Sequence, residues 1–214
     1  MIIKIIHIIC GAVALLAGLG AIIFRKKVSY HKVFGKIYFY SMSIIFVSSI
    51  YLSLIKSNVF LLCVAFFSYY QCLVAFRALR LKKIHLGQGP TKQDWFIEIV
   101  FCCAHISFVT FAIYQFILGN TSIGIVSFIF GATGLSANRS TIKRLKGKIS
   151  EKNYWLIAHV SGMLGSYIGA ITAFTVNNNQ RLGIPDLLAW LGPTLVLVPI
   201  IVYEVRKLKL STIS

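Results

Sequence analysis

Acidic side chains are scarce in this sequence. Only five Asp and Glu residues stand against 22 Lys and Arg in 214 residues, and charged residues make up 13% of the chain. The acids are Asp94, Glu98, Glu151, Asp186 and Glu204. The sequence also lacks a Gly-rich phosphate loop, a pair of catalytic carboxylates and a Ser, His and Asp in a useful order. This scarcity argues against a hydrolase and leaves open whether the chain is an enzyme.

Cysteine is equally unsuited to a disulfide framework. The five cysteines are Cys10, Cys63, Cys72, Cys102 and Cys103. All five fall inside apolar runs, and an odd number leaves at least one of them unpaired. Because buried thiols behave as small hydrophobic side chains, we expect these cysteines to serve in packing.

Apolar residues are what the sequence has in excess. They make up 57% of the chain, which is more than a soluble core of this size can bury. The apolar runs predict membrane spans at about 2–24, 35–55, 58–79, 95–118, 121–138, 154–176 and 187–205. The expected fold is therefore all-α, a single domain over residues 1–214 formed by a bundle of seven transmembrane helices.

The basic residues lie between the apolar runs in an alternating pattern. Segments 25–36, 77–92, 139–152 and 206–209 carry nineteen Lys and Arg, and the connections on the other side carry three. By the positive-inside rule this predicts an N-terminus outside and a cytoplasmic C-terminus. The net charge of +17 then indicates contact with anionic lipid rather than with nucleic acid. A bacterial cytoplasmic membrane is the expected location.

Two connections carry strong turn signals. In "RLKKIHLGQGPTKQDW" the Gly-Gln-Gly-Pro segment should break the helix, so that Asp94 caps the fourth span and Trp95 lies at headgroup level. The connection "NNNQRLGIPD" combines Asn, Gly and Pro, and it should be a turn rather than a helix.

Histidines are the main candidates for a functional site, because ionisable residues within a membrane usually face the protein interior. At about 1.5 Å per helical residue, His7 and His105 fall in the outer half of the bilayer. By the same measure, His31 and His159 fall in the inner half. His7 and His159 each stand beside a series of small residues, and His105 shares a helix face with Glu98.

Two histidines from different helices can hold the iron of haem b, and small residues make room for the porphyrin. Our first hypothesis is therefore a haem b electron-transfer protein that binds the cofactor through His7, His31, His105 and His159. Such a protein would exchange electrons with quinone or a redox partner protein. Packing or interhelical hydrogen bonding is the alternative for His7, His105 and His159, and contact with lipid headgroups is the alternative for His31. A metal site of two Cys and two His is another possibility.

Two other function classes remain open. In a transporter or proton carrier, the polar residues of the sixth span would line a path and Glu98 or His7 would relay protons. In a non-catalytic membrane subunit or scaffold, the glycine-rich faces would only pack helices.

The order of several motifs resembles a known family. The motifs are "HIICGAVALLAGLGAI", "SYHKVFGKIYFYSM", "AFRAL", "HVSGMLGSYIGAITAFTVN" and "LAWLGPTL". Together they resemble the bacterial membrane protein family called domain of unknown function 2306, over nearly the whole chain. The resemblance implies motif positions at His7, His31, Arg77, His159, Met163, Tyr167, Thr172 and Asn177. Lys32 departs from the arginine expected there. Together with Glu98, the non-histidine positions form the predicted polar path.

Overall fold

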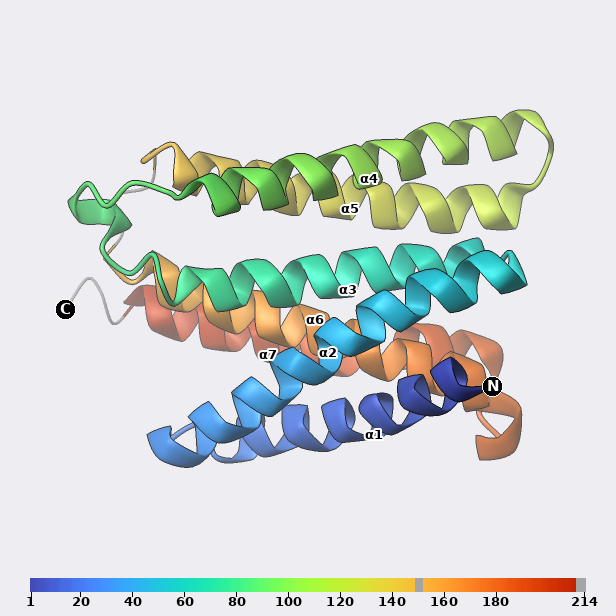
Figure 1. Cartoon of the computed structure of the whole chain (residues 1–214), viewed down its shortest axis with the longest axis horizontal. Coiled ribbons are helices and arrows are strands. Elements are labelled where there is room, and N and C mark those ends of the chain that lie inside the picture. Colours follow the sequence, from blue (N-terminus) through green and yellow to red (C-terminus); the bar gives the residue numbers. More distant parts are fainter. Residues whose placement is uncertain (149–151, 211–214) are drawn as a thin grey trace. The chain divides into compact units, whose positions relative to one another are not determined.

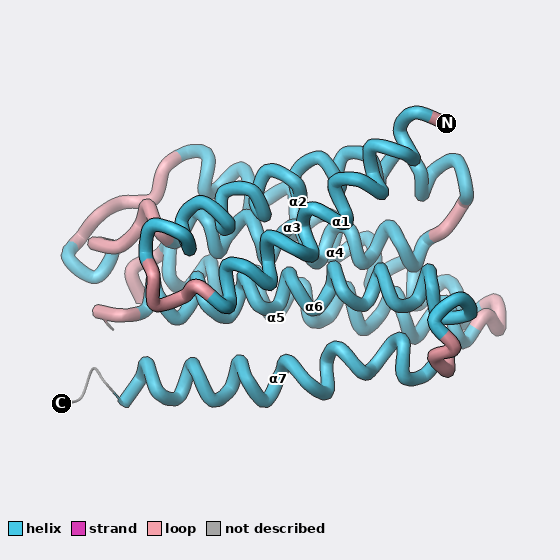
Figure 2. Tube along the Cα trace, turned by 90° about the horizontal axis from the view of Figure 1, so that it is seen from below, coloured by secondary structure: helices cyan, strands magenta, loops and turns pink. Residues whose placement is uncertain are grey.

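The computed structural model describes residues 1–148 and 152–210, and every regular element in them is helical (Figure 2). Among these described residues, seven helices are long and apolar enough to cross a membrane, which confirms the predicted all-α class and agrees with the seven predicted segments. Glu151 lies outside the described residues. The elements are α1 (Ile2–Ile23), α2 (Val28–Lys56), α3 (Val59–Ala78), η1 (Ile84–Leu86), α4 (Lys92–Ile117), α5 (Thr121–Leu145), α6 (Tyr154–Leu182) and α7 (Asp186–Leu210).

Several helices extend well beyond the predicted spans, because the prediction used the thickness of the hydrocarbon layer and helices continue into the headgroup region. The clearest correction is at α6, where the predicted turn after residue 176 is helical as far as Leu182. Asn177 and Asn178 bond their own helix, to the carbonyls of Ala173 and Phe174, at 2.7 and 2.8 Å. The helix ends only at Gly183, whose φ of 64° suits glycine.

The chain forms two compact units. The first contains Met1–Cys72 and Leu164–Ile200, and the second contains Leu73–Met163 and Ile201–Ser214. Helices α3, α6 and α7 therefore contribute residues to both units. That the two units act as one domain stays a prediction.

In the first unit, α1 packs against α2 (Figure 1). Two glycines of α1 lie at contacts with aromatic side chains. A Cβ at Gly18 would meet the rings of Tyr167 and Tyr38, and a Cβ at Gly20 would meet the ring of Phe34 at 2.8 Å. Both glycines are buried. The small residues of α1 therefore accept aromatic rings from neighbouring helices of the same unit.

Buried hydroxyl groups join α6 to the other helices of this unit. Tyr38 Oη lies 2.8 Å from Ser166 Oγ, and Tyr167 Oη donates to the Leu15 carbonyl at 2.9 Å. These bonds satisfy polar groups that lipid cannot satisfy.

A proline inside α7 exposes a backbone carbonyl that α6 then satisfies. Pro193 has no N–H, so the carbonyl of Ala189, four residues earlier, loses its helical donor. The Thr175 hydroxyl lies 2.7 Å from this carbonyl, closer than to the carbonyls of its own helix at 3.0 and 3.1 Å. The hydroxyl of Thr175 therefore replaces the donor that proline removes, and ties α7 to α6.

We expect Thr175→Val to lower the free energy of unfolding by about 1–3 kcal/mol, because the carbonyl of the buried residue Ala189 loses its donor. Denaturation in SDS titrations measures this change. In a Pro193→Ala background the new backbone N–H takes the carbonyl, so the same Thr175→Val change should cost less than half as much. Equal costs in both backgrounds would contradict this role of Thr175.

In the second unit, α4 and α5 form an antiparallel pair (Figure 1). The buried residues of α4 are Asp94, Glu98, Phe101, His105, Phe108, Ala112 and Gln115. Those of α5 are Gly124, Ser127, Gly131, Gly134, Asn138, Thr141, Arg144 and Leu145. Their alternating spacing of three and four residues is that of a continuous packed seam. We call it the α4–α5 seam.

Candidate functional site

The α4–α5 seam contains a chain of three buried polar side chains. Asn138 Nδ2 donates to Glu98 Oε2 at 2.9 Å, and Asn138 Oδ1 lies 2.7 Å from His105 Nδ1. The exposed fractions of Glu98, His105 and Asn138 are 2%, 0% and 1%. Because an amide oxygen only accepts, Nδ1 of His105 carries a proton and donates. The sequence placed Glu98 and His105 on one face of α4, and Asn138 of α5 links them.

Glycine creates the space that the His105 ring occupies. A Cβ at Gly134 would overlap the imidazole ring itself, and a Cβ at Gly131 would lie 2.9 Å from the backbone oxygen of His105. The rings of Phe101 and Phe108 flank the imidazole, each with its centroid 6.4 Å away. The imidazole is thus enclosed by the glycine-lined face of α5 and by two phenylalanine rings of α4, all within its own unit.

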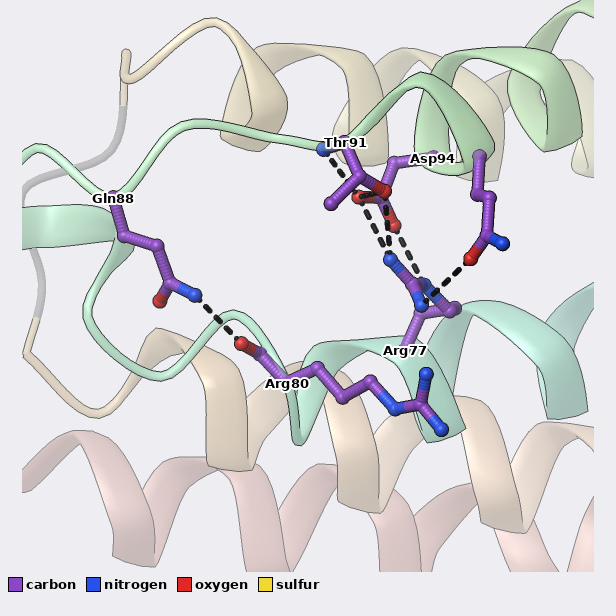
Figure 3. Close-up of polar contacts among 6 residues, drawn as sticks. Arg77, Arg80, Gln88, Thr91 and Asp94 are labelled. Carbon is purple, nitrogen blue, oxygen red and sulfur yellow. Dashed lines mark hydrogen bonds and ion pairs between the residues drawn. The ribbon is translucent and has the colours of Figure 1, made fainter.

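An ion pair lies at the start of α4. Arg77 Nε donates to Asp94 Oδ1 at 2.7 Å, and its Nη2 donates to Asp94 Oδ2 at 3.0 Å and to Thr91 Oγ1 at 2.9 Å (Figure 3). The side chains of Arg77 and Asp94 are 10% and 3% exposed. This two-point contact suits the planar guanidinium group and could not be made by lysine.

The same carboxylate also caps α4, in a way that corrects the sequence prediction. Asp94 was expected to be the N-cap, but the N-cap is Thr91, and Asp94 is the third residue of the helix. Asp94 Oδ2 accepts from the Thr91 backbone N–H at 2.8 Å and from its hydroxyl at 2.7 Å. The two residues form a capping box, which fixes where the helix begins.

The connection between α3 and α4 is held by one glutamine. Gln88 Nε2 donates to the Arg80 carbonyl at 2.8 Å (Figure 3), and Gln88 Oε1 accepts from the Lys83 N–H at 3.0 Å. Gly87 permits the turn, with a φ of 87°. The Gly-Gln-Gly-Pro segment therefore forms a fixed loop, and this loop positions Thr91 and Asp94 against Arg77.

A small cavity separates the ion pair from the polar chain. Its volume is about 10 Å³, close to the smallest space that holds one water molecule. It is lined by Val74, Arg77, Asp94, Ile97, Glu98, Thr141, Arg144 and Leu145. Two acids and two arginines thus meet around a space that fits water but not an organic ligand. The eight residues that line the cavity, together with Asn138 and His105, are called the charged seam site below.

His7 bonds a hydroxyl group of α2. Its Nδ1 lies 2.9 Å from Ser48 Oγ. Ser48 Oγ also lies within donating distance of the carbonyls of Ile44 and Ile45, at 2.8 and 3.0 Å. A hydroxyl can donate or accept, so this bond joins α1 to α2 with either tautomer of His7.

His31 and His159 have the same tautomer as His105. The Nδ1 of His31 lies 2.9 Å from the Ala21 carbonyl, and that of His159 lies 3.1 Å from the Ala75 carbonyl. A carbonyl only accepts, so both rings donate through Nδ1. Three of the four candidate histidines therefore donate from Nδ1, and in their neutral rings the lone pair is on Nε2.

Histidines of the same unit lie at different depths. His31 bonds Ala21, which is fourteen residues after His7 on α1, or roughly 21 Å along that helix. His159 bonds Ala75, close to the Arg77–Asp94 pair, and His105 is eleven residues beyond Asp94, roughly 16 Å along α4. The depths predicted from the sequence would pair His7 with His105 and His31 with His159. Each pair combines a histidine of the first unit with one of the second, and both pairs stay predictions. No group of three or more His, Cys, Asp or Glu suited to a metal ion occurs in the described part of the chain.

The predicted polar path on α6 does not form a continuous line within the first unit. Tyr167 and Thr172 are buried, whereas Asn177 is exposed and bonds its own helix. Steps of five residues turn a helix by about 140°, so these three side chains point in different directions. Met163, which is partly buried, belongs to the second unit.

Sequence reasoning missed four polar residues of the charged seam site and its cap: Thr91, Asn138, Thr141 and Arg144. Three of them follow the spacing of small and polar residues along α5. The predicted fifth span stopped at residue 138 and left out Thr141 and Arg144, whereas the helix continues for two more turns to Leu145. Asn138 lies within that span, but spacing alone does not show that it faces α4.

No match to this chain was found among protein-family models, curated proteins or solved structures. The family resemblance therefore stays a prediction.

Gly134→Ala should displace the His105 ring and lower the free energy of unfolding by about 1–3 kcal/mol, because overpacking forces neighbouring groups to move. Gly11→Ala on α1 is the matched control, since no atom lies within 4 Å of the Cβ it adds. That change should be neutral or stabilising by up to about 1 kcal/mol. Equal melting temperatures for the two variants would contradict the close packing of His105 on Gly134.

Proposed function

We propose that this integral membrane protein is a proton carrier whose titrating groups are Glu98 and His105. The observation that supports the proposal is the buried chain from Glu98 through Asn138 to His105 inside a membrane-spanning helix pair. A carboxyl and an imidazole buried at membrane depth are costly, and in membrane proteins they commonly mark proton or ion pathways.

The two titrating groups lie at different depths. Glu98 and His105 are seven residues apart on α4, which corresponds to roughly 10 Å along the helix. A proton that moves from Glu98 to Nε2 of His105 leaves a carboxylate at one depth and creates an imidazolium at the other. The movement shifts positive charge across about a third of the hydrocarbon layer.

Asn138 favours this separation of charge. Its N–H points at the carboxylate and its oxygen faces the imidazole N–H. This orientation of the amide dipole stabilises an anion at Glu98 and a cation at His105 together, through charge-assisted hydrogen bonds. The amide orients the two charges, while the proton itself passes by water or by side-chain motion.

The ion pair and the cavity affect the electric field at Glu98 and the access of protons to its carboxyl group. The Arg77–Asp94 pair keeps its opposite charges locked together, so it adds little net field. The cavity beside Glu98 has the volume of about one water molecule. This is the place from which Glu98 takes up or releases a proton.

The test is proton uptake into liposomes that hold the purified protein and a pH-sensitive dye, driven by a potassium diffusion potential. Wild type should acidify the lumen faster than empty liposomes, and Glu98→Gln should return the rate to that of empty liposomes. Asn138→Leu should slow uptake about 10- to 100-fold, because a hydrogen bond to a charged group contributes about 1.5–3 kcal/mol.

The control is Glu204→Gln, which removes the same charge from α7 and should keep the wild-type rate. All variants should elute as one peak in size-exclusion chromatography. A wild-type rate no higher than that of empty liposomes would overturn the proposal, as would an unchanged rate in Glu98→Gln. Either outcome would favour the alternative of a non-catalytic subunit or scaffold.

A haem b electron-transfer protein is the second candidate, supported by the histidine tautomers. Histidines that bind metal commonly donate Nδ1–H to a carbonyl and present Nε2 to the metal, and His31 and His159 make that bond. The packing of His105 on Gly134 leaves no room for a porphyrin beside that ring. Bound haem would supply one-electron chemistry with quinone or a redox partner protein.

An absorption spectrum separates the two candidates. Protein purified from cells supplied with haem should show a Soret band if the second candidate holds, and His159→Ala or His31→Ala should remove it. His85→Ala, in the loop, should leave the band unchanged. A colourless protein that is folded and monodisperse rules this candidate out and leaves the carrier untouched.

Orientation and location complete the proposal. We infer an N-terminus outside and a C-terminus in the cytoplasm of a bacterial membrane from the distribution of Lys and Arg. The resemblance to domain of unknown function 2306 supports the bacterial assignment. In this orientation Glu98 faces the cytoplasmic side and His105 the middle of the bilayer.

A further inference from the structure

The second unit gathers exposed basic side chains at the end where α3 stops and α4 begins. Nine Lys and Arg are exposed there: Arg80, Lys82, Lys83, Lys92, Arg139, Lys143, Lys146, Lys148 and Lys152. The acids described at this end, Asp94 and Glu98, are buried. The nine exposed basic side chains therefore make this surface strongly positive, and it attracts anions.

Three basic groups at this end lie against aromatic rings. Lys82 Nζ is 4.5 Å from the centroid of the Trp155 ring, and Arg144 Cζ is 5.8 Å from that of Tyr154. Arg80 Cζ lies 6.0 Å from the ring of Phe76. The Lys82 side chain is exposed, so the ring of Trp155 orients its positive charge without neutralising it.

Trp155 and Tyr154 form the first turn of α6, where a membrane-spanning helix begins. Both side chains are partly buried, and Tyr154 Oη lies 3.0 Å from Ser140 Oγ. Aromatic residues with one polar end prefer the level of the lipid headgroups. The contact with Trp155 thus holds the Lys82 ammonium at the level of the lipid phosphates.

Exposed apolar side chains continue from this end toward the hydrocarbon. On the first turns of α4, Phe96 is 67% exposed and Ile99 is 61% exposed. A ligand bound at this end therefore meets positive charge at its head and apolar surface along its length. A free phosphate ion would use only the first of these, whereas a phospholipid uses both.

We propose that the basic end of the second unit is a binding site for an anionic phospholipid, with Lys82 and Trp155 at its centre. The phosphodiester lies against the ammonium of Lys82 and the acyl chains lie along the exposed apolar residues. The site is independent of proton transport, so either proposal can fail without the other.

Fluorescence of Trp155 tests the site in the full-length protein. Trp95→Phe and Trp190→Phe leave Trp155 as the only tryptophan, and the protein is reconstituted in phosphatidylcholine vesicles. Brominated phosphatidylglycerol should quench this fluorescence more strongly than brominated phosphatidylcholine at the same mole fraction. Lys82→Gln should weaken the apparent affinity for phosphatidylglycerol about fivefold, which corresponds to about 1 kcal/mol for one lysine near anionic lipid.

Lys82→Arg keeps the charge and should keep the affinity, while Lys4→Gln removes a lysine from the start of α1 and should change nothing. Equal quenching by the two brominated lipids would overturn the proposal. Equal losses in Lys82→Gln and Lys4→Gln would do the same, since they would show general charge attraction only. Loss of the excess quenching on adding inorganic phosphate at constant ionic strength would assign the site to free phosphate and not to lipid.

Discussion

The absence of hydrogen-bond partners in hydrocarbon is the constraint on which this structure depends. Every polar group at membrane depth must find its partner within the protein. The contacts already described obey it: Thr175 satisfies the carbonyl that Pro193 leaves open, and Asn138 satisfies both Glu98 and His105. Glycine contributes to this, because a position without a side chain lets the rings and polar groups of a neighbouring helix come close enough to make contact.

Sequence alone predicts the elements of this fold well and their polar ends less well. The length of each apolar run identifies a span, because a helix must be apolar over the thickness of the hydrocarbon layer to lie in it. The ends are set instead by local bonds: Asn177 and Asn178 extend α6 by bonding back to their own helix, and Thr91 displaces Asp94 from the cap position. Such choices between helix and turn cost little free energy, so composition does not decide them.

For the candidate site as well, the sequence predicts one part and leaves another part undetermined. Helical periodicity places Glu98 and His105 on one face of α4, and this much follows from spacing. Which helix faces them does not follow, because periodicity gives the direction of a side chain and not its neighbour. Asn138 became part of the site only through the antiparallel pairing of α4 with α5, in which glycines bring the backbones close.

The two acids of α4 differ in when their partners are synthesised. Arg77 precedes Asp94 by 17 residues, so its guanidinium has already left the ribosome when the carboxylate emerges. Asn138 follows Glu98 by 40 residues, which translation covers in roughly 2–8 s. During that interval Glu98 has no amide from α5 and must stay hydrated, be protonated, or wait beside the insertion machinery. The buried amide partner of Glu98 is therefore a late addition to the helix that carries it, whereas the partner of Asp94 is present from the start.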